Sequence, residues 1–142
     1  MRGEDNLVNA DDDQVYQDDL VTAFIAPYWW PHNAGHVIII PNAHVENIYD
    51  LPREYSHRVQ DEAQVSALAF KATYHRQGVS TRQHNEPAGY QDIWHYHLHI
   101  FPRNVGDDLY QSRRSPEVAP AERRRAYAEL IKGYLTEHTS TD

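Results

Sequence analysis

The chain has 142 residues, of which 40% are hydrophobic and 24% are charged, as expected for one globular domain and not for a disordered or fibrous chain. Its formal charge of −8 argues against a long nucleic acid as a partner, because a phosphate backbone would repel it. The absence of cysteine excludes disulfides and thiolate zinc sites. No apolar run approaches the roughly 20 residues that a membrane-spanning helix needs, so no membrane is expected as a partner.

The N-terminal segment, residues 1–14, is acidic and polar and has little apolar periodicity. We therefore expect a flexible end there, followed by a single domain over residues 15–142. The segment lacks the basic and apolar regions of a secretory signal and the arginine-rich character of a transit peptide. We therefore expect a cytoplasmic protein.

Two buried strands are predicted near the start of the domain. Residues 20–27, LVTAFIAP, form a mostly apolar run, and residues 35–41, GHVIIIP, form a β-branched run bounded by Gly and Pro. The seven residues between them, YWWPHNA, are too few for a crossover helix. The two strands are therefore expected to be antiparallel neighbours.

Two helices and a further strand are predicted in the rest of the chain. A long helix is expected within residues 51–78, where a proline suits the first turn and a glycine ends the pattern. Residues 78–83 suggest a short strand, and residues 84–92 a loop. A second amphipathic helix begins near Pro120. The arginines at positions 123–125 are expected on its exposed face.

Residues 94–103, WHYHLHIFPR, place three histidines at alternate positions. A period of two over residues 93–102 predicts a strand, on which successive side chains point to opposite faces. His95, His97 and His99 would then share one face, while the large apolar residues between them share the other. One face packs against the core, and the other presents imidazoles.

Three uses of such a histidine face are open. Three buried structural histidines would each need a polar partner, which is costly. A rise of about 3.3 Å per residue separates the α-carbons of His95 and His99 by roughly 13 Å, so a metal site would need two of the three histidines plus His36, His44 or a carboxylate. Nucleophilic and acid–base chemistry on a phosphoryl group is the third use, and His97 in the middle is then the natural nucleophile.

Three stretches, at 35–44, 85–92 and 95–103, together resemble the signature of the histidine triad family of nucleotide-binding hydrolases and transferases. The resemblance covers roughly residues 20–110. It implies an α+β domain whose antiparallel sheet of about five strands carries one long and one C-terminal helix, and a homodimer in which two sheets join. It also implies cleavage at the α-phosphate of a purine nucleotide conjugate, which would be a phosphoramidate, an acyl-nucleotide or a dinucleoside polyphosphate.

The resemblance also assigns catalytic roles by position, with no cofactor and no metal. His97 resembles the nucleophile, which forms a nucleotidyl-histidine intermediate. His99 and Gln91 resemble phosphate contacts, and His95 with His36 resembles the hydrogen-bonded support behind the nucleophile. A nucleotide-binding or scaffold protein with incidental turnover, and a His-ligated metal protein, are the alternative functions.

Further substrate contacts follow from the same resemblance. Asn85 lies near the family's loop Asn or Gln, and His44 matches a second histidine after the Gly-His strand. Tyr28 occupies the position where the family often has an Asp or Asn that holds the ribose hydroxyls. Asp92 stands where a small hydroxyl residue is frequent, and a carboxylate there would repel a phosphate unless it turns away or holds a metal.

Overall fold

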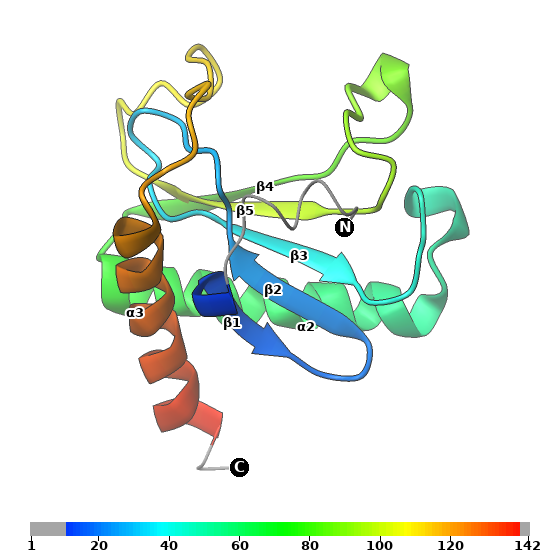
Figure 1. Cartoon of the computed structure of the whole chain (residues 1–142), viewed down its shortest axis with the longest axis horizontal. Helices are drawn as coiled ribbons and strands as arrows, with labels where there is room; N and C mark the ends of the chain where they lie inside the picture. Colours follow the sequence, from blue (N-terminus) through cyan, green and yellow to red (C-terminus); the bar gives the residue numbers. More distant parts are fainter. Residues whose placement is uncertain (1–10, 140–142) are drawn as a thin grey trace.

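The computed structural model describes residues 11–139 and is built on a five-stranded antiparallel sheet (Figure 1). The strand order is β1-β2-β3-β5-β4, and every neighbouring pair is antiparallel. The strands are β1 (Gln14–Gln17), β2 (Val21–Ile25), β3 (Val37–Pro41), β4 (Gly78–Arg82) and β5 (Leu98–Arg103). The expected α+β fold with about five strands is confirmed, including the antiparallel pairing of β2 with β3.

Two helices pack against this sheet. Helix α2 (Arg53–Ala69), which continues into the π-helical segment η3 (Phe70–Tyr74), lies across β2, β3 and β5. Helix α3 (Ala121–Thr139) packs beside β1 and the end of α2 (Figure 1). Three short 3₁₀ turns complete the described chain: η1 (Asp11–Asp13), η2 (Ile48–Asp50) and η4 (Pro87–Gly89). Within residues 11–139, neither helix is both long and apolar enough to cross a membrane.

The register of β5 against its neighbours decides which side chains share a face. His99 lies opposite Ile38 of β3 and opposite Arg82 of β4. Because residues paired across a ladder point to the same face, these three side chains lie together. Their chain neighbours Val37 and Ile100 are fully buried on the other face, which α2 covers. The sheet therefore has a packed helix face and a face that carries the histidines.

The strand predicted over residues 93–102 begins later than expected. β5 begins at Leu98, so only His99 of the three histidines lies on the strand, and His95 and His97 lie in the irregular segment before it. The reason is that both neighbouring ladders have ended: the last partner of β5 on β3 is Ile39, opposite Leu98, and the last on β4 is Arg82, opposite His99. A period of two in the sequence does not reveal where the neighbouring strands stop.

The N-terminal part of the described chain is docked. Of the segment 1–14 expected to be flexible, residues 1–10 lie outside the described residues. Asp13 is buried, and its carboxylate accepts a hydrogen bond from Arg124 Nη1 at 2.7 Å. Arg124 is therefore buried as well, and its expected place on an exposed helix face is wrong. β1, which the sequence did not predict, follows directly as an edge strand.

Candidate active site

The ring of His97 is held by the backbone just before it. Its Nδ1 lies 2.8 Å from the main-chain carbonyl oxygen of His95. A carbonyl can only accept, so Nδ1 carries the proton and Nε2 carries the lone pair. Nε2 lies 3.8 Å from Oδ1 of Asp92, whose side chain is 73% exposed, while His97 itself is buried. The ring is thus fixed in the tautomer that leaves a basic nitrogen free.

The His95 ring lies behind this arrangement and does not contact the His97 ring nitrogens. Its Nε2–H donates to the carbonyl oxygen of Pro41 at the end of β3, at 3.0 Å. The N–H of Tyr96 donates to the carbonyl oxygen of Val45, at 2.6 Å. Burial lowers the pKa of His95, and its hydrogen bond to Pro41 opposes that shift. Together these contacts fasten the irregular segment before β5 to the end of β3, which sets the direction of the His95 carbonyl.

His36, which is buried, and His99, which is half-buried, form a second pair. Nδ1 of His99 lies 3.3 Å from Nε2 of His36, and the His36 ring stacks on Phe101 with centroids 4.5 Å apart. Burial, reinforced by the nearby Arg82 cation, lowers the pKa of His36 to about 3. Burial also lowers the pKa of His99 well below its usual value, with smaller contributions from His36, His97 and Arg82. Both rings are therefore neutral near pH 7.

The turn that precedes β3 positions His36. Gly35 has a φ of +81°, and a Cβ there would lie only 2.7 Å from the ring of Tyr127. Both the left-handed backbone and this close approach require glycine. The carbonyl of Gly35 accepts a hydrogen bond from the Tyr74 hydroxyl at 2.8 Å. The backbone of Gly35 thus packs against η3 and α3, and this places the side chain of His36 next to His99.

A cavity of about 680 Å³ opens beside His97 and His99. Its size is that of a pocket for a small molecule or nucleotide. Its other walls come from the loop after β2, from the end of β4 and from the loop after β5. The lining side chains that carry charge or aromatic rings, besides the histidines, are Tyr28, Trp30, Arg82, Asp92, Tyr110, Arg113 and Arg114.

Three arginines give the cavity a positive wall. The guanidinium of Arg82 lies 5.4 Å from the ring centroid of Trp30 and 5.4 Å from that of Tyr110. The guanidinium of Arg114 lies 4.2 Å from the ring centroid of Tyr28. Such contacts hold a cation over an aromatic face without neutralising it. Among residues 11–139, neither these two arginines nor Arg113 forms an ion pair.

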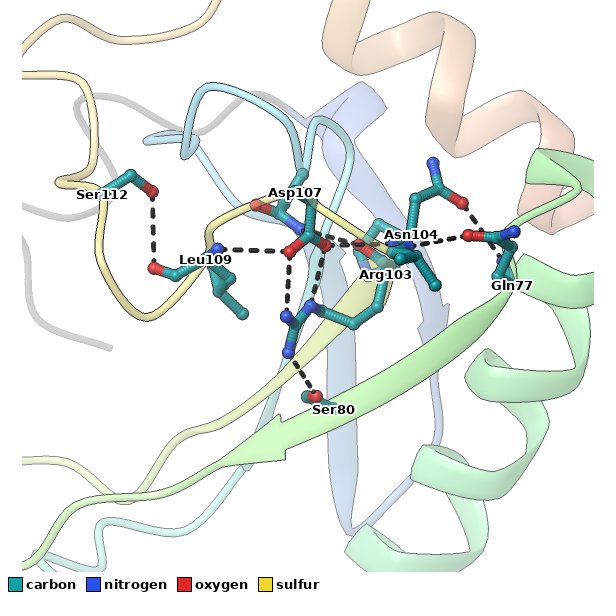
Figure 2. Close-up of polar contacts among 10 residues, drawn as sticks. Gln77, Ser80, Arg103, Asn104, Asp107, Leu109 and Ser112 are labelled. Carbon is teal, nitrogen blue, oxygen red and sulfur yellow. Dashed lines mark hydrogen bonds and ion pairs between the residues drawn. The ribbon is translucent and has the colours of Figure 1, made fainter.

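A bidentate ion pair holds the loop that forms this wall (Figure 2). Nε and Nη2 of Arg103 donate to the two carboxylate oxygens of Asp107, each at 2.8 Å. The backbone N–H groups of Asn104 and Leu109 donate to the same carboxylate, at 3.0 and 3.2 Å. The hydrogen bonds from Arg103 hold the pKa of Asp107 well below its usual range. Leu109 is thereby fixed on the cavity wall.

Not every residue predicted for the site lies on the cavity. Tyr28, His36, His97 and His99 line it, whereas His95, Gln91, Asn85 and His44 do not. His44 is exposed, with its ring 5.5 Å from that of His95. Of the two histidines expected to support the nucleophile, His95 bonds to the carbonyl oxygen of Pro41 and His36 contacts His99.

Gln91 and Asn85 brace the loop between β4 and β5. The side chain of Gln91 accepts from the N–H of Glu86 at 2.7 Å and donates to the carbonyl oxygens of Glu46 and Ile93. The side-chain oxygen of Asn85 accepts from the N–H of Ile48 at 2.8 Å. Both amides are thus used in fastening this loop to the segment after β3, and neither reaches the cavity.

The positive wall of the cavity is not predicted from the sequence. Arg82 was the last residue but one of a predicted strand, and its pairing with His99 depends on the β4–β5 register. Arg113 and Arg114 lie in the irregular stretch after β5, where periodicity gives no signal. The spacing of Arg103 and Asp107 was the one available clue that this stretch folds back on the strand. Within residues 11–139, no group of three or more His, Asp or Glu side chains is arranged to hold a metal ion.

Comparisons with known proteins agree with this geometry. A family model described as HIT domain matches residues 8–106. Protein hit from Bacillus subtilis is 33% identical over 90 residues, which are 63% of this chain and 61% of that protein. The match thus spans less than two thirds of that relative. The purine nucleoside phosphoramidase of Escherichia coli K12 is 32% identical over 91 residues, 62% of this chain and 73% of the enzyme.

A solved structure extends the similarity to most of the chain. The crystal structure of a Hit-like protein involved in cell-cycle regulation from Bartonella henselae, with an unknown ligand, superposes with a TM-score of 0.76. It is 31% identical in sequence, and the alignment covers 87% of this chain and 86% of that one. The family model thus includes the segment with the three histidines, and the similarity in fold extends over most of the chain.

Proposed function

The chain belongs to the HIT domain family, and on this basis we propose that it is a nucleotidyl hydrolase or transferase that cleaves at the α-phosphate of a purine nucleotide conjugate. The observation that carries the proposal is the Nδ1–H bond from His97 to the His95 carbonyl, which leaves Nε2 as a free base on the cavity. An imidazole nitrogen with its lone pair free is a competent nucleophile near neutral pH. The phosphoramidase activity named for the Escherichia coli relative belongs to the same reaction class.

In the proposed reaction, Nε2 of His97 attacks the α-phosphorus. A phosphorus–nitrogen bond forms while the bond from phosphorus to the leaving nitrogen or oxygen breaks. The leaving group departs with the bonding pair, and an amine then takes a proton from solvent. Water or another acceptor next attacks the same phosphorus and gives up a proton to solvent, the bonding pair returns to Nε2 of His97, and the nucleotide is released. His97 ends neutral, so the cycle needs no oxidant, reductant or cofactor.

His99 is proposed to donate to a phosphate oxygen. If Nε2–H of His36 donates to Nδ1 of His99, then His99 keeps its own proton on Nε2, facing the cavity. This assignment leaves Nδ1 of His36, which is buried without a partner, as an acceptor. The opposite assignment would bury an unpaired N–H, which native structures rarely tolerate. Because both rings are neutral, the pair can orient a donor without adding charge.

The positive wall is proposed to balance the charge of the substrate. Arg82, Arg113 and Arg114 carry no carboxylate partner among the described residues, so they are available to phosphate oxygens. The aromatic rings of Tyr28 and Trp30 offer faces for a base or ribose. The leaving group can be an amine, a carboxylate or a nucleoside polyphosphate.

Gln91 and Asn85 are proposed to position the site and not to bind phosphate directly. Their side chains hold the loop before His95 in place, and direct phosphate contact would break these bonds. His44, exposed beside His95, remains a proposed contact for a substrate group that extends past the end of β3. A homodimer formed by joining two sheets also remains a proposal.

Two measurements on one purified sample test the function. A panel of a nucleoside phosphoramidate, an acyl-nucleotide and a dinucleoside polyphosphate should include one efficient substrate. The reaction of that substrate should be quenched at alkaline pH, because the phosphorus–nitrogen bond on imidazole is acid-labile. The peptide spanning residues 94–103 should then carry a nucleotide adduct. Activity should survive prolonged chelation. Tight nucleotide binding with no turnover of any of the three would favour a binding or scaffold protein, and loss of activity to chelator with recovery on adding metal would favour the His-ligated metal protein.

A further inference from the structure

A second cleft, of about 440 Å³, lies across the loop after β5 from the catalytic cavity. It is bounded by residues 31–34, by Arg76 after η3, by the turn at 104–107 and by the first turns of α3. None of its lining residues also lines the catalytic cavity. The proposed reaction gives this cleft no role.

The charges around the cleft are unbalanced. Arg76 and Arg123 approach it from separate elements, and neither forms an ion pair within residues 11–139. The guanidinium of Arg123 lies 5.0 Å from the ring centroid of Trp29, which holds it in place without neutralising it. His32 lines the cleft as well. Two cations thus face one cleft in a chain whose formal charge is −8.

One carboxylate also lines the cleft, but its charge is already paired. Both oxygens of Asp107 accept from Arg103, at 2.8 Å each (Figure 2). Nδ2 of Asn33 donates to the same carboxylate at 2.9 Å. Asp107 therefore cannot serve Arg76 or Arg123 without giving up these bonds. The two guanidiniums are left with donors that no carboxylate within the described residues takes up.

One of those donors has been removed from water. Nε of Arg76 is buried and has no hydrogen-bond partner in the described chain. A buried donor without an acceptor costs free energy, and a ligand that draws the Arg76 side chain into the cleft, where Nε meets an acceptor, would recover it. A guanidinium offers its N–H groups in a planar fork that matches two oxygens of one phosphate or carboxylate. The orphaned Nε of Arg76 points to that kind of ligand.

We infer that this cleft is a second anion site, which binds a phosphate group between Arg76 and Arg123, apart from the cavity that holds His97. The site suits free inorganic phosphate or the phosphate of a nucleotide, since both present the same oxygens. Asn104, whose side chain also lines the cleft, would contribute a polar contact beside the two cations. The Arg103–Asp107 pair supports the cleft wall but is not itself available to the ligand.

Crystals of the wild-type protein soaked with inorganic phosphate, and separately with AMP, test the site directly. We expect phosphate density between Arg76 and Arg123 in the first soak. Density there in the AMP soak would add nucleotide phosphate as a source, whereas AMP confined to the His97 cavity would restrict the site to the free ion. Phosphate density in the His97 cavity alone would overturn the inference.

A solution measurement uses three charge-removing variants. Phosphate should raise the melting temperature of the wild type and of Arg125→Gln, a control whose half-exposed side chain lies on α3 outside the cleft. Arg76→Gln and Arg123→Gln should each lose part of that rise, because the catalytic cavity contributes equally to all four proteins. Equal rises in all four proteins would contradict a phosphate site in the cleft. If either cleft variant fails to fold, the wild-type crystal still decides.

Discussion

His97 donates its Nδ1–H to the main-chain carbonyl oxygen of His95, 2.8 Å away. The support behind the proposed nucleophile is thus a backbone atom, and no side chain within residues 11–139 shares the Nδ1 proton. A backbone acceptor survives any substitution at position 95. The ring of His95 enters only indirectly, through its hydrogen bond to Pro41. Substitutions at the two histidines should therefore have very different effects.

Replacing His97 by Ala should abolish turnover and preserve nucleotide binding. The substitution removes Nε2, the only atom that the proposed mechanism uses as a nucleophile, while the arginines and aromatic rings of the cavity remain. We expect kcat to fall by about three orders of magnitude or more, as for other residues that act within one catalytic unit. Steady-state kinetics measures the loss of turnover, and calorimetric titration with AMP measures the preserved nucleotide binding. Near-normal turnover by His97→Ala would exclude the covalent route and require direct attack by water.

Replacing His95 by Ala should have a milder effect. The carbonyl that accepts from His97 remains, but the segment before β5 loses its hydrogen bond to the carbonyl oxygen of Pro41. We expect kcat to fall by about 10- to 100-fold with little change in KM, since the loss is one of ring orientation. His57→Ala, at an exposed position on α2 away from the cavity, is the control and should leave kcat near that of the wild type. A loss for His95→Ala as large as for His97→Ala would show that the His95 ring takes part in the chemistry.

The strands could be predicted where their residues carry enough pattern by themselves. The run from Val37 to Pro41 is β-branched and bounded by turn residues, and the structure has a strand there. β1 is only four residues long and is flanked by acidic residues, so its apolar content is too small to give a signal. Its place at the sheet edge depends on docking to β2 and α3, which is tertiary information.

The candidate site could be predicted only in part for the same reason. Alternating histidines marked the segment, but the register that puts Arg82 opposite His99 depends on how β4 and β5 pair. Arg114 reaches the cavity through a loop that has no periodicity of its own and is held by one ion pair at its base. Conversely, Gln91 lies within the motif, but its side chain forms hydrogen bonds to backbone groups. Motif spacing identifies the chemistry, and long-range packing decides which side chains face the cavity.

Glu62 on α2 should make the protein less stable as pH rises from about 4.5 to 7. Its side chain is 3% exposed, and burial raises its pKa from 4.5 to about 7, while the nearby Arg58 partly opposes the shift. Between these two values the folded chain binds more protons than the unfolded chain, so stability falls as pH rises from about 4.5 to 7 and is level above. At roughly 1.4 kcal/mol per pKa unit, the loss amounts to a few kcal/mol.

Urea denaturation of Glu62→Gln at pH 5 and pH 8 measures this effect. The variant cannot ionise, so it should exceed the wild type in free energy of unfolding at pH 8 and differ less at pH 5. Glu54→Gln, at an exposed position in the first turn of the same helix, should follow the wild type at both pH values. The pKa of Asp18 is lowered to about 2, so its own titration falls below this window. An equal loss of stability in Glu62→Gln at both pH values would mean that the charged form is the one the fold uses.

The protein should be a dimer at micromolar concentration. β4 is an edge strand, whereas the other edge, β1, is covered by α3. An open edge presents unpaired backbone groups, and pairing with a second copy would satisfy them. Light scattering should give a mass of twice the 16.5 kDa of the chain. A mass of 16.5 kDa that persists up to high micromolar concentration would contradict the joining of two sheets.

Arg82 should contribute both charge and pH dependence to the site. Its guanidinium lines the cavity and lies 5.0 Å from the ring centroid of Phe101, on which His36 stacks. Arg82→Gln should lower kcat/KM by about 100-fold, because a preorganised cation facing the phosphate is lost. Burial is the main cause of the lowered pKa of His36 and His99, but the Arg82 cation adds to it.

Removing that cation should let the two histidines protonate more easily. The acid limb of the kcat/KM profile should therefore move to higher pH in Arg82→Gln, since a protonated His36–His99 pair can no longer keep one ring as the acceptor. Arg82→Lys keeps the charge and should retain the wild-type acid limb, even if the loss of the planar guanidinium lowers kcat/KM. Steady-state measurement of kcat/KM from pH 4 to pH 9 separates the two effects. A uniform drop in Arg82→Gln with an unchanged profile would mean that Arg82 acts on packing or on substrate charge alone, and that burial by itself keeps the pair neutral.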